Sequence, residues 1–302
     1  MAVHVMGGMT VIPTINLHEK HRGPTLCVMH HSKTLPTYFI SHGGGPWPYI
    51  PEMRSMFRYL EASLIGIVRD LREEPRAVLV VSGHWTENDF AITSNPQPPM
   101  VYDYSGFPPY TYQVQYPAPG DPALAQQVQS LLQQAGVAAS LDATQGYDHG
   151  TFTPLVIMYP EANVPVVQLS MKLGYDPAEH IAAGRAIAKL REENVLIVGS
   201  GLSYHNMRAM SPAGEQASKT FDDWLQQTLI HATGKTRSSK LIDWASAPAA
   251  RQAHPREDHL IPLMVAVGAA ESEQGALVYH EEGLFGGITA SSFRFGEVPR
   301  RD

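Results

Sequence analysis

Apolar runs rich in β-branched residues recur along the chain, and stretches with helical periodicity separate them. The strongest run, residues 77–81, reads AVLVV and contains no polar residue. A strand that is apolar on both faces needs cover on both sides, as in a parallel sheet flanked by helices. Shorter runs of this kind stand at 37–40, 166–169 and 195–198. The alternation predicts an α/β fold, with a central, mostly parallel or mixed sheet flanked by helices on both faces.

Helical periodicity and first-turn prolines predict where the helices lie. The expected helices span residues 52–72, 121–135, 177–192, 214–231 and 256–269. Residues 95–120 differ, because they contain seven prolines and six tyrosines or phenylalanines. That composition suits neither a helix nor a central strand, and it predicts a long ordered loop of the kind that often covers a site.

Length and composition limit the domain organisation and the partners. Residues 1–34 lack periodicity, which predicts an N-terminal extension ahead of a single domain at 35–302. The formal net charge of -7 argues against a nucleic-acid partner. The single cysteine, Cys27, allows neither an intrachain disulfide nor a thiolate cluster, and it predicts the reducing cytoplasm. No apolar run is long enough for a membrane span or a signal peptide, so no membrane partner is expected.

Three histidines occupy similar positions relative to the predicted strands. His42 and His84 each follow an apolar strand in a glycine-containing turn, and His205 lies a few residues beyond a third strand. Ligand sites in α/β folds form where the carboxyl ends of strands meet. These three side chains could therefore face one crevice.

Two further segments carry histidines that could join this crevice. The helix predicted from residue 256 would place His259 about one turn in, pointing back toward the N-terminal end of the helix. His254 could reach the same place or only cap the helix. His149 lies in a polar loop, where Asp148 could orient it. Neutral imidazoles suit zinc, iron or copper, and three protein ligands with open coordination positions are the layout of a catalytic site.

These residues lie in motifs that resemble a known family. The chain is similar to the class III extradiol ring-cleaving dioxygenases of the LigB type, in their 4,5-DOPA dioxygenase-like branch. The matching stretches are 36–44 (PTYFISHGG), 80–85 (VVSGHW), 104–107 (YSGF), 116–121 (YPAPGD), 148–150 (DHG), 199–206 (GSGLSYHN) and 254–260 (HPREDHL). Each motif is weak by itself, but the ordered set runs through most of the chain and is specific.

The resemblance implies a set of site residues. His42, His84 and His259 would hold one metal ion per chain, Fe(II) or Zn(II), in a catalytic domain at 35–302. His205 would be the acid–base residue, with a role as fourth ligand left open. His149 would lie beside the substrate and dioxygen.

The third ligand and the substrate wall are less sharply defined. Better-known ring-cleaving members complete their site with a glutamate, whereas the aligned residue here is His259, as in the DOPA-like branch. Glu257 and Asp258 leave a carboxylate ligand open. We also expect four residues to contact the substrate, namely Tyr104, Phe107, Trp85 and His254. The alternative for the aromatic residues of the proline-rich loop is equally open, since they would pack against one another without a substrate.

The predicted activity is the opening of an aromatic ring by O2 beside one hydroxyl of a catechol-type substrate, at a non-haem metal centre. His205 would take a phenolic proton and later return one, and His149 would stabilise negative charge that develops on oxygen. Two alternatives remain, a zinc-dependent hydrolase on the same site and a non-enzymatic metal-binding module. The expected partners are a small aromatic diol and O2, and an exposed edge strand or helix would allow a homodimer.

Overall fold

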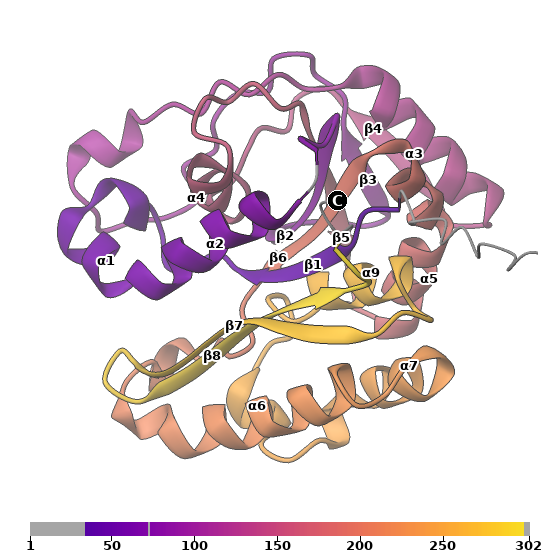
Figure 1. Cartoon of the computed structure of the whole chain (residues 1–302). Helices are drawn as coiled ribbons and strands as arrows, with labels where there is room; N and C mark the ends of the chain where they lie inside the picture. Colours follow the sequence, from indigo (N-terminus) through magenta and orange to yellow (C-terminus); the bar gives the residue numbers. More distant parts are fainter. Residues whose placement is uncertain (1–33, 72, 299–302) are drawn as a thin grey trace, which may run out of the picture. The chain divides into compact units, whose positions relative to one another are not determined.

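The computed structural model describes residues 34–71 and 73–298, and these form an α/β domain (Figure 1). Apart from Thr34, the predicted extension at 1–34 lies outside the described residues. The strands are β1 (Thr37–Ser41), β2 (Ala77–Glu87), β3 (Phe90–Thr93), β4 (Ala139–Asp142), β5 (Val166–Lys172), β6 (Val195–Gly201), β7 (Gly275–Leu284) and β8 (Ile288–Phe295). The helices are α1 (Pro51–Met56), α2 (Arg58–Asp70), α3 (Pro122–Gln134), α4 (His149–Met158), α5 (Pro177–Ile187), α6 (Glu215–Leu229), α7 (Gly234–Ile242), α8 (Ala250–Ala253) and α9 (Pro262–Ala269).

All eight strands of the described chain join one sheet, in the order β4-β3-β5-β2-β6-β1-β8-β7. The central strands β5, β2, β6 and β1 are parallel to one another. β8 pairs antiparallel with both β1 and β7, and β3 pairs antiparallel with β5. The predicted α/β class with a mixed sheet is therefore confirmed, and the carboxyl ends of β1, β2 and β6 meet at one edge.

Helices cover both faces of the central strands. Successive residues of a strand point to opposite faces. Ser200 of β6 donates a hydrogen bond to the carbonyl of Gly150 in α4, whereas a Cβ at the preceding Gly199 would meet the carbonyl of Pro262 in α9. α4 and α9 therefore lie on opposite faces of β6, and all eight residues of α9 are buried. A helix that is apolar all round suits this position between other elements.

α4 contains a proline that would interrupt an isolated helix. Pro154 has no N–H to donate to the carbonyl of Gly150, four residues earlier. Ser200 donates to that carbonyl instead, so the buried oxygen keeps a partner. A side chain of β6 thus replaces the backbone donor that α4 lacks at Pro154. The helix begins at His149, beside the predicted site.

Two of the sequence predictions need correction. β2 continues to Glu87 instead of ending near residue 81, because it pairs with β5 again after a register shift between Val81 and Thr86. His84 therefore lies on an irregular part of a strand and not in a turn. The helix predicted at 256–269 begins only at Pro262, because a proline inside a longer helix would lack a donor and clash with the preceding turn. His259 consequently lies in the turn before α9.

The proline-rich segment at 95–120 is confirmed as a long loop. Within it the structure has one short 3-10 helix, Pro109–Tyr112, and an isolated bridge between Met100 and Tyr147.

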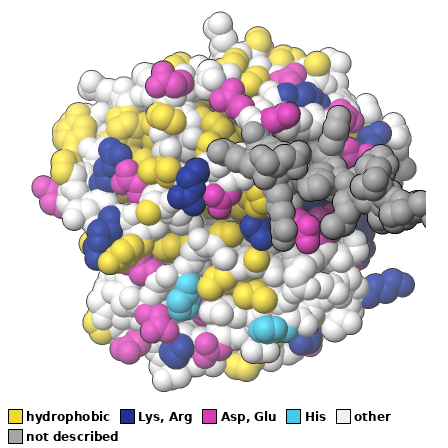
Figure 2. Space-filling model, viewed as in Figure 1, with side chains coloured by type: hydrophobic (Ala, Val, Ile, Leu, Met, Phe, Trp, Pro, Cys, Tyr) yellow, Lys and Arg dark blue, Asp and Glu magenta, His cyan; other side chains and the backbone are white. Residues whose placement is uncertain are grey.

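On the face drawn in Figure 2, acidic and basic side chains of the described residues are interspersed. None of the helices described is both long enough and apolar enough to span a membrane.

Two histidines in the core make stability depend on pH. His180 donates from Nδ1 to the carbonyl of Asp176 at 2.7 Å, and His254 donates from Nε2 to the carbonyl of Ser203 at 3.0 Å. Burial lowers the pKa of His180 to about 4 and that of His254 to about 3. Both folded pKa values lie below the unfolded value of about 6.5. The unfolded chain therefore binds more protons as the pH falls below 6.5, and folding loses stability there.

We expect each of these histidines to remove about 2 kcal/mol from the free energy of unfolding between pH 7.5 and pH 5. Urea unfolding at the two pH values measures the loss. His180→Gln should reduce the loss of unfolding free energy between the two pH values by the contribution of one histidine, about 2 kcal/mol. His231→Gln, at an exposed position, should leave that loss unchanged. An equal pH dependence in wild type and His180→Gln would contradict the assignment.

Candidate active site

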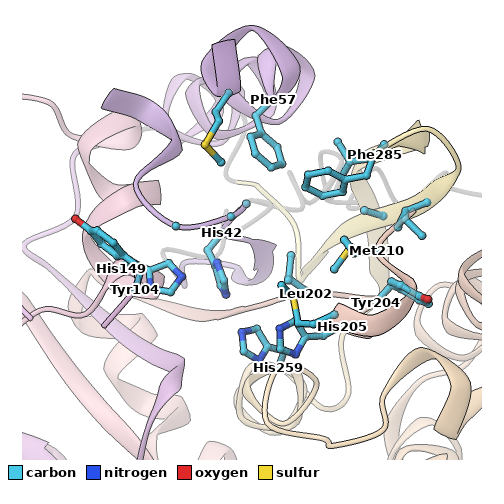
Figure 3. A pocket seen from close by; sticks show the side chains of 18 of the residues that line it. His42, Phe57, Tyr104, His149, Leu202, Tyr204, His205, Met210, His259 and Phe285 are labelled. Carbon is cyan, nitrogen blue, oxygen red and sulfur yellow. The ribbon is translucent and has the colours of Figure 1, made fainter. Parts of the chain in front are cut away.

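His42, His84 and His259 come together at the carboxyl edge of the central strands. One ring nitrogen from each lies within 4.8 Å of the others. His42 directly follows β1, where its backbone N–H donates to the carbonyl of Gly201 in β6 at 3.1 Å. The ring centroid of His42 lies 5.0 Å from that of His84 and 5.2 Å from that of His259. Residues 217 positions apart thus present their imidazoles to one point, as Figure 3 shows for His42 and His259.

The proton positions on His84 and His259 follow from two carboxylates. The Nδ1 of His84 lies 3.1 Å from Oδ2 of Asp103, and the Nδ1 of His259 lies 3.0 Å from Oδ1 of Asp258. An ionised carboxylate only accepts, so each Nδ1 carries the proton and each Nε2 presents a lone pair. The two Nε2 atoms lie 3.1 Å apart. Two lone pairs at this distance would repel each other. A proton on Nε2 of His84, which the raised pKa of that residue favours, or a metal ion in contact with both atoms removes the repulsion.

His42 supplies independent support for a cation. Its side chain is buried, and neither ring nitrogen has a hydrogen-bond partner among the described residues. A buried polar atom without a partner is costly and needs an explanation, such as an ion. Three imidazoles with unused lone pairs fit a non-haem metal ion and match the layout of a catalytic centre.

The charges around the centre favour this arrangement. Burial, and then the neighbouring histidines, hold the pKa of His42 well below its usual value, and burial is also the largest cause of the low pKa of His259. Burial acts to lower the pKa of His84 as well, but the hydrogen bond with Asp103 and nearby carboxylates raise it overall. The same carboxylates that attract a proton to His84 would attract a metal cation.

Asp103 also holds His149, so one carboxylate joins two histidines. Its Oδ1 accepts from the backbone N–H of His149 at 3.0 Å and lies 2.8 Å from Nδ1 of that residue. Burial acts to raise the pKa of Asp103, but the bonds with His149 and His84 outweigh it and keep the pKa well below its usual range. The prediction that Asp148 orients His149 is wrong. Asp148 accepts from Ser82 at 2.7 Å and caps α4 through Thr151 at 3.1 Å.

Asp258 forms a second link of the same kind. Its Oδ1 lies 3.6 Å from Nδ1 of His205, in addition to its contact with His259. The rings of His205 and His259 stack with centroids 3.5 Å apart. Each carboxylate thus contacts one predicted metal ligand and one other predicted catalytic residue, His149 or His205. Glu257, the other carboxylate left open by the sequence, pairs instead with Arg251 at 2.6 Å.

Gly201 lets the segment that carries His259 lie directly on β6. A Cβ at this position would fall 2.1 Å from the carbonyl oxygen of His259. That carbonyl accepts instead from the N–H of Leu202 at 3.0 Å. A side chain larger than hydrogen would push the third histidine away from the other two.

A cavity of about 610 Å³ opens over the three histidines. Tyr104 and Phe107 line it, as predicted for the substrate wall, together with His149 and His205. Two other residues that we expected to contact the substrate do not line this cavity. Trp85 does not line the cavity, because it follows His84 on a strand and therefore points to the other face, where its Nε1 donates to Glu87 at 3.0 Å. His254 does not line it either, because it is buried against Phe221, with ring centroids 5.3 Å apart.

Asp103 is the functional candidate that the sequence reasoning missed. It immediately precedes the matched stretch at 104–107, but it lies in a loop without periodicity and 46 positions from His149. The signal available was an aspartate beside an aromatic motif in the proline-rich loop. Such a residue has no special status until the fold brings it to the histidines.

We expect Asp103→Asn to lower the affinity for zinc or iron(II) by about 10- to 100-fold. The amide keeps the size of the side chain but has one acceptor oxygen in place of two, so it cannot accept from both His84 and His149. Competition with a chromophoric chelator measures the affinity. The exposed Asp89 offers a matched control, since Asp89→Asn removes the same charge away from the site. Equal metal affinities for both variants would contradict the linking role of Asp103.

Comparisons with known proteins agree with this geometry. The family profile described as "Catalytic LigB subunit of aromatic ring-opening dioxygenase" matches residues 36–296. A 4,5-DOPA dioxygenase extradiol of Beta vulgaris is 35% identical over 263 residues, which cover 86% of this chain and 96% of the relative. A dioxygenase of Hapsidospora irregularis, tasH, is 34% identical over 279 residues, which cover 86% of this chain and 85% of the relative. The crystal structure of an uncharacterized Escherichia coli K12 protein has a TM-score of 0.71 at 28% identity and covers 87% of this chain and all of its own.

Proposed function

The chain belongs to the LigB family of class III extradiol dioxygenases and is an aromatic ring-opening dioxygenase that uses a non-haem metal, and from this premise we propose its substrate class and site. The substrate is a catechol-type diol that is opened with O2 beside one hydroxyl. His42, His84 and His259 hold one metal ion, His205 moves the proton, and His149 stabilises charge on oxygen.

One observation carries the proposal. The Nε2 atoms of His84 and His259 face each other at 3.1 Å at the floor of a cavity, beside the buried imidazole of His42, which has no hydrogen-bond partner among the residues described. A bound ion would therefore have protein ligands on one side and the cavity on the other. This supports a site in which the substrate oxygens reach the ion directly, as an open catalytic centre requires.

Iron(II) is the proposed metal. Bound at this centre, iron(II) would supply the redox chemistry between the aromatic ring and O2, which zinc cannot provide because it has no redox chemistry. His42 and His259 stay neutral at physiological pH, because burial holds their pKa well below the usual value. Both imidazoles are then available as ligands without first losing a proton.

His205 and His149 divide the work on protons and charge. His205 has a partly exposed side chain, lines the cavity and is steadied by Asp258, so it is placed to accept a phenolic proton and return it to the product. His149 is fixed by Asp103 at the N-terminus of α4. Nδ1 of His149 donates to the ionised Asp103, and burial lowers the pKa of His149, so the resting ring is neutral with a lone pair on Nε2. His149 would donate toward negative charge on oxygen once its Nε2 has taken up a proton from the substrate.

The proposal is tested by reconstituting the protein with iron(II) under anaerobic conditions and then adding air and a catechol. We expect O2 uptake and a yellow ring-opened semialdehyde product, with zinc-loaded protein as the inactive control. An absence of O2 uptake by the iron-loaded protein over a broad panel of catechols would refute the catechol assignment. Activity of the zinc-loaded protein without O2 uptake would indicate hydrolysis instead.

A further inference from the structure

The outer part of the cavity is apolar, in contrast to its histidine floor. Three segments build it, namely α1 with the residue that follows it, the residues after His205, and the hairpin of β7 and β8. Figure 3 shows Phe57 and Phe285 across the cavity from His205 and His259, with Met210 between Phe285 and His205. The side chains concerned are Met53, Phe57, Met207, Met210, Phe285 and Ile288.

We propose that this wall selects catechols that carry a large apolar substituent, and not an amino-acid side chain. The inference rests on the proposed function, because it assumes that the diol is held over the histidines. The cavity of about 610 Å³ has the size of sites that enclose drug-sized ligands, and an unsubstituted catechol would fill only a small part of it.

The charged groups of the cavity support this class. None of the described residues that line it is a lysine or an arginine, so a substrate carboxylate would find no cation beyond the histidine floor. The one acidic residue of the lining, Asp258, already contacts His205 and His259. A charged group that enters an apolar wall without a partner loses its hydration and binds poorly.

The hydroxyls of the two lining tyrosines also point to other partners. Tyr104 donates to the carbonyl of Thr111 at 2.5 Å, and Tyr204 donates to the carbonyl of Ala209 at 3.2 Å. Each tyrosine therefore presents its ring to the cavity while its polar atom is used in the protein. Met207, with 70% of its surface exposed, extends the apolar wall toward solvent. An exposed methionine at a cavity rim is a flexible contact for apolar ligands.

Phe285 is held in the wall at a conformational cost. Phe285 and Gly286 have φ of 51° and 84°, and the N–H of Gly287 donates to the carbonyl of Leu284 at 3.1 Å. This is the type I′ hairpin pattern, in which Asn-Gly is favoured and a bulky first residue is not. The ring packs edge-to-face on Phe57, with centroids 5.7 Å apart. A strained residue at a cavity wall points to a use for its side chain.

Equilibrium binding tests the substrate class without turnover. Zinc-loaded protein is titrated under anaerobic conditions with catechol, 4-n-hexylcatechol and DOPA, and binding is followed by calorimetry. We expect hexylcatechol to bind at least about tenfold more tightly than catechol, since burial of each methylene adds to affinity, and DOPA to gain nothing over catechol. If DOPA binds as tightly as hexylcatechol or more tightly, or if hexylcatechol binds no better than catechol, the inference is overturned.

A variant of the hairpin separates ligand contact from a structural role. Phe285→Asn introduces the preferred turn pair, so we expect an unchanged or higher Tm together with a loss of about tenfold in hexylcatechol affinity and little change for catechol. Phe285→Leu keeps an apolar side chain and should retain most of the preference. Unchanged hexylcatechol affinity in Phe285→Asn would overturn the role of this wall.

The same ligands distinguish a failure here from a failure of the proposed function. Tight hexylcatechol binding with no O2 uptake by the iron-loaded protein would refute the proposed function and leave the apolar selectivity standing. O2 uptake with DOPA at a kcat/KM equal to or above that with hexylcatechol would support the proposed function and refute the selectivity.

Discussion

Replacing His42 with alanine should abolish metal-dependent activity and remove the gain in Tm that metal binding gives the wild-type protein. The reason is that both buried ring nitrogens of His42 lack a hydrogen-bond partner in the described part of the chain, so they are available to a metal ion. Two imidazoles would remain, and a site with two protein ligands no longer matches a catalytic centre with three. We expect kcat to fall by at least about 10²- to 10³-fold.

The measurement that isolates the ligand role is thermal unfolding with and without metal. Wild type should gain Tm on addition of iron(II) or zinc, because a ligand that binds only the folded state stabilises it. His42→Ala should fold without metal and show no such gain, whereas His231→Ala, at an exposed position, should behave as wild type. A metal-dependent rise in Tm as large as that of wild type would show that His42 is not a ligand.

Strand-end histidines were predictable from sequence because the physics there is local. The apolar runs that became β1, β2 and β6 require burial on both faces, and parallel neighbours place their carboxyl ends together. His42 follows the end of β1 directly, and His205 lies a few residues beyond the end of β6. The chain position of a histidine thus fixed its place in the sheet before any tertiary contact was considered.

Strands β8 and β4 were missed because their burial does not follow hydrophobicity. β8 is almost fully buried but contains Thr289, Ser291 and Ser292. Their backbone or side-chain groups are satisfied by partners far away in sequence, such as the N–H of Ser41, which donates to Ser292 at 2.9 Å. β4 fails for the opposite reason, because none of its four residues is buried. Pattern reading detects strands only where apolar side chains make the buried face.

The links between site residues were beyond sequence reasoning for a different reason. Nothing local connects Asp103 to His84 and His149, and their contact depends on the path of the proline-rich loop. Trp85 points away from the cavity because β2 continues past His84 to Glu87, and His259 lies in a turn because Pro262 prevents a longer helix. Single residues in loops and at element ends thus decide where the site side chains point, although they leave the fold class unchanged.

His205→Ala should lower kcat by about 10²- to 10⁴-fold while metal content stays at the wild-type level, since loss of a proton-transfer group costs about this much. The contacts of His205 are compatible with our proposal that it moves protons beside the centre. Its ring stacks on His259 at 3.5 Å, and its Nδ1 contacts Asp258. The ring nitrogens of His42, His84 and His259 come within 4.8 Å of one another without it, and His205 forms a second such group with Asp258 and His259.

Metal analysis and steady-state kinetics on the same preparation separate the two roles left open for this residue. A proton-transfer role predicts full metal content, little change in KM, and partial recovery of kcat when free imidazole is added to the variant. Loss of metal from His205→Ala would instead make His205 a fourth ligand. In that case the open side of the centre would be smaller than proposed, and a diol could no longer reach the ion with both oxygens while leaving room for O2.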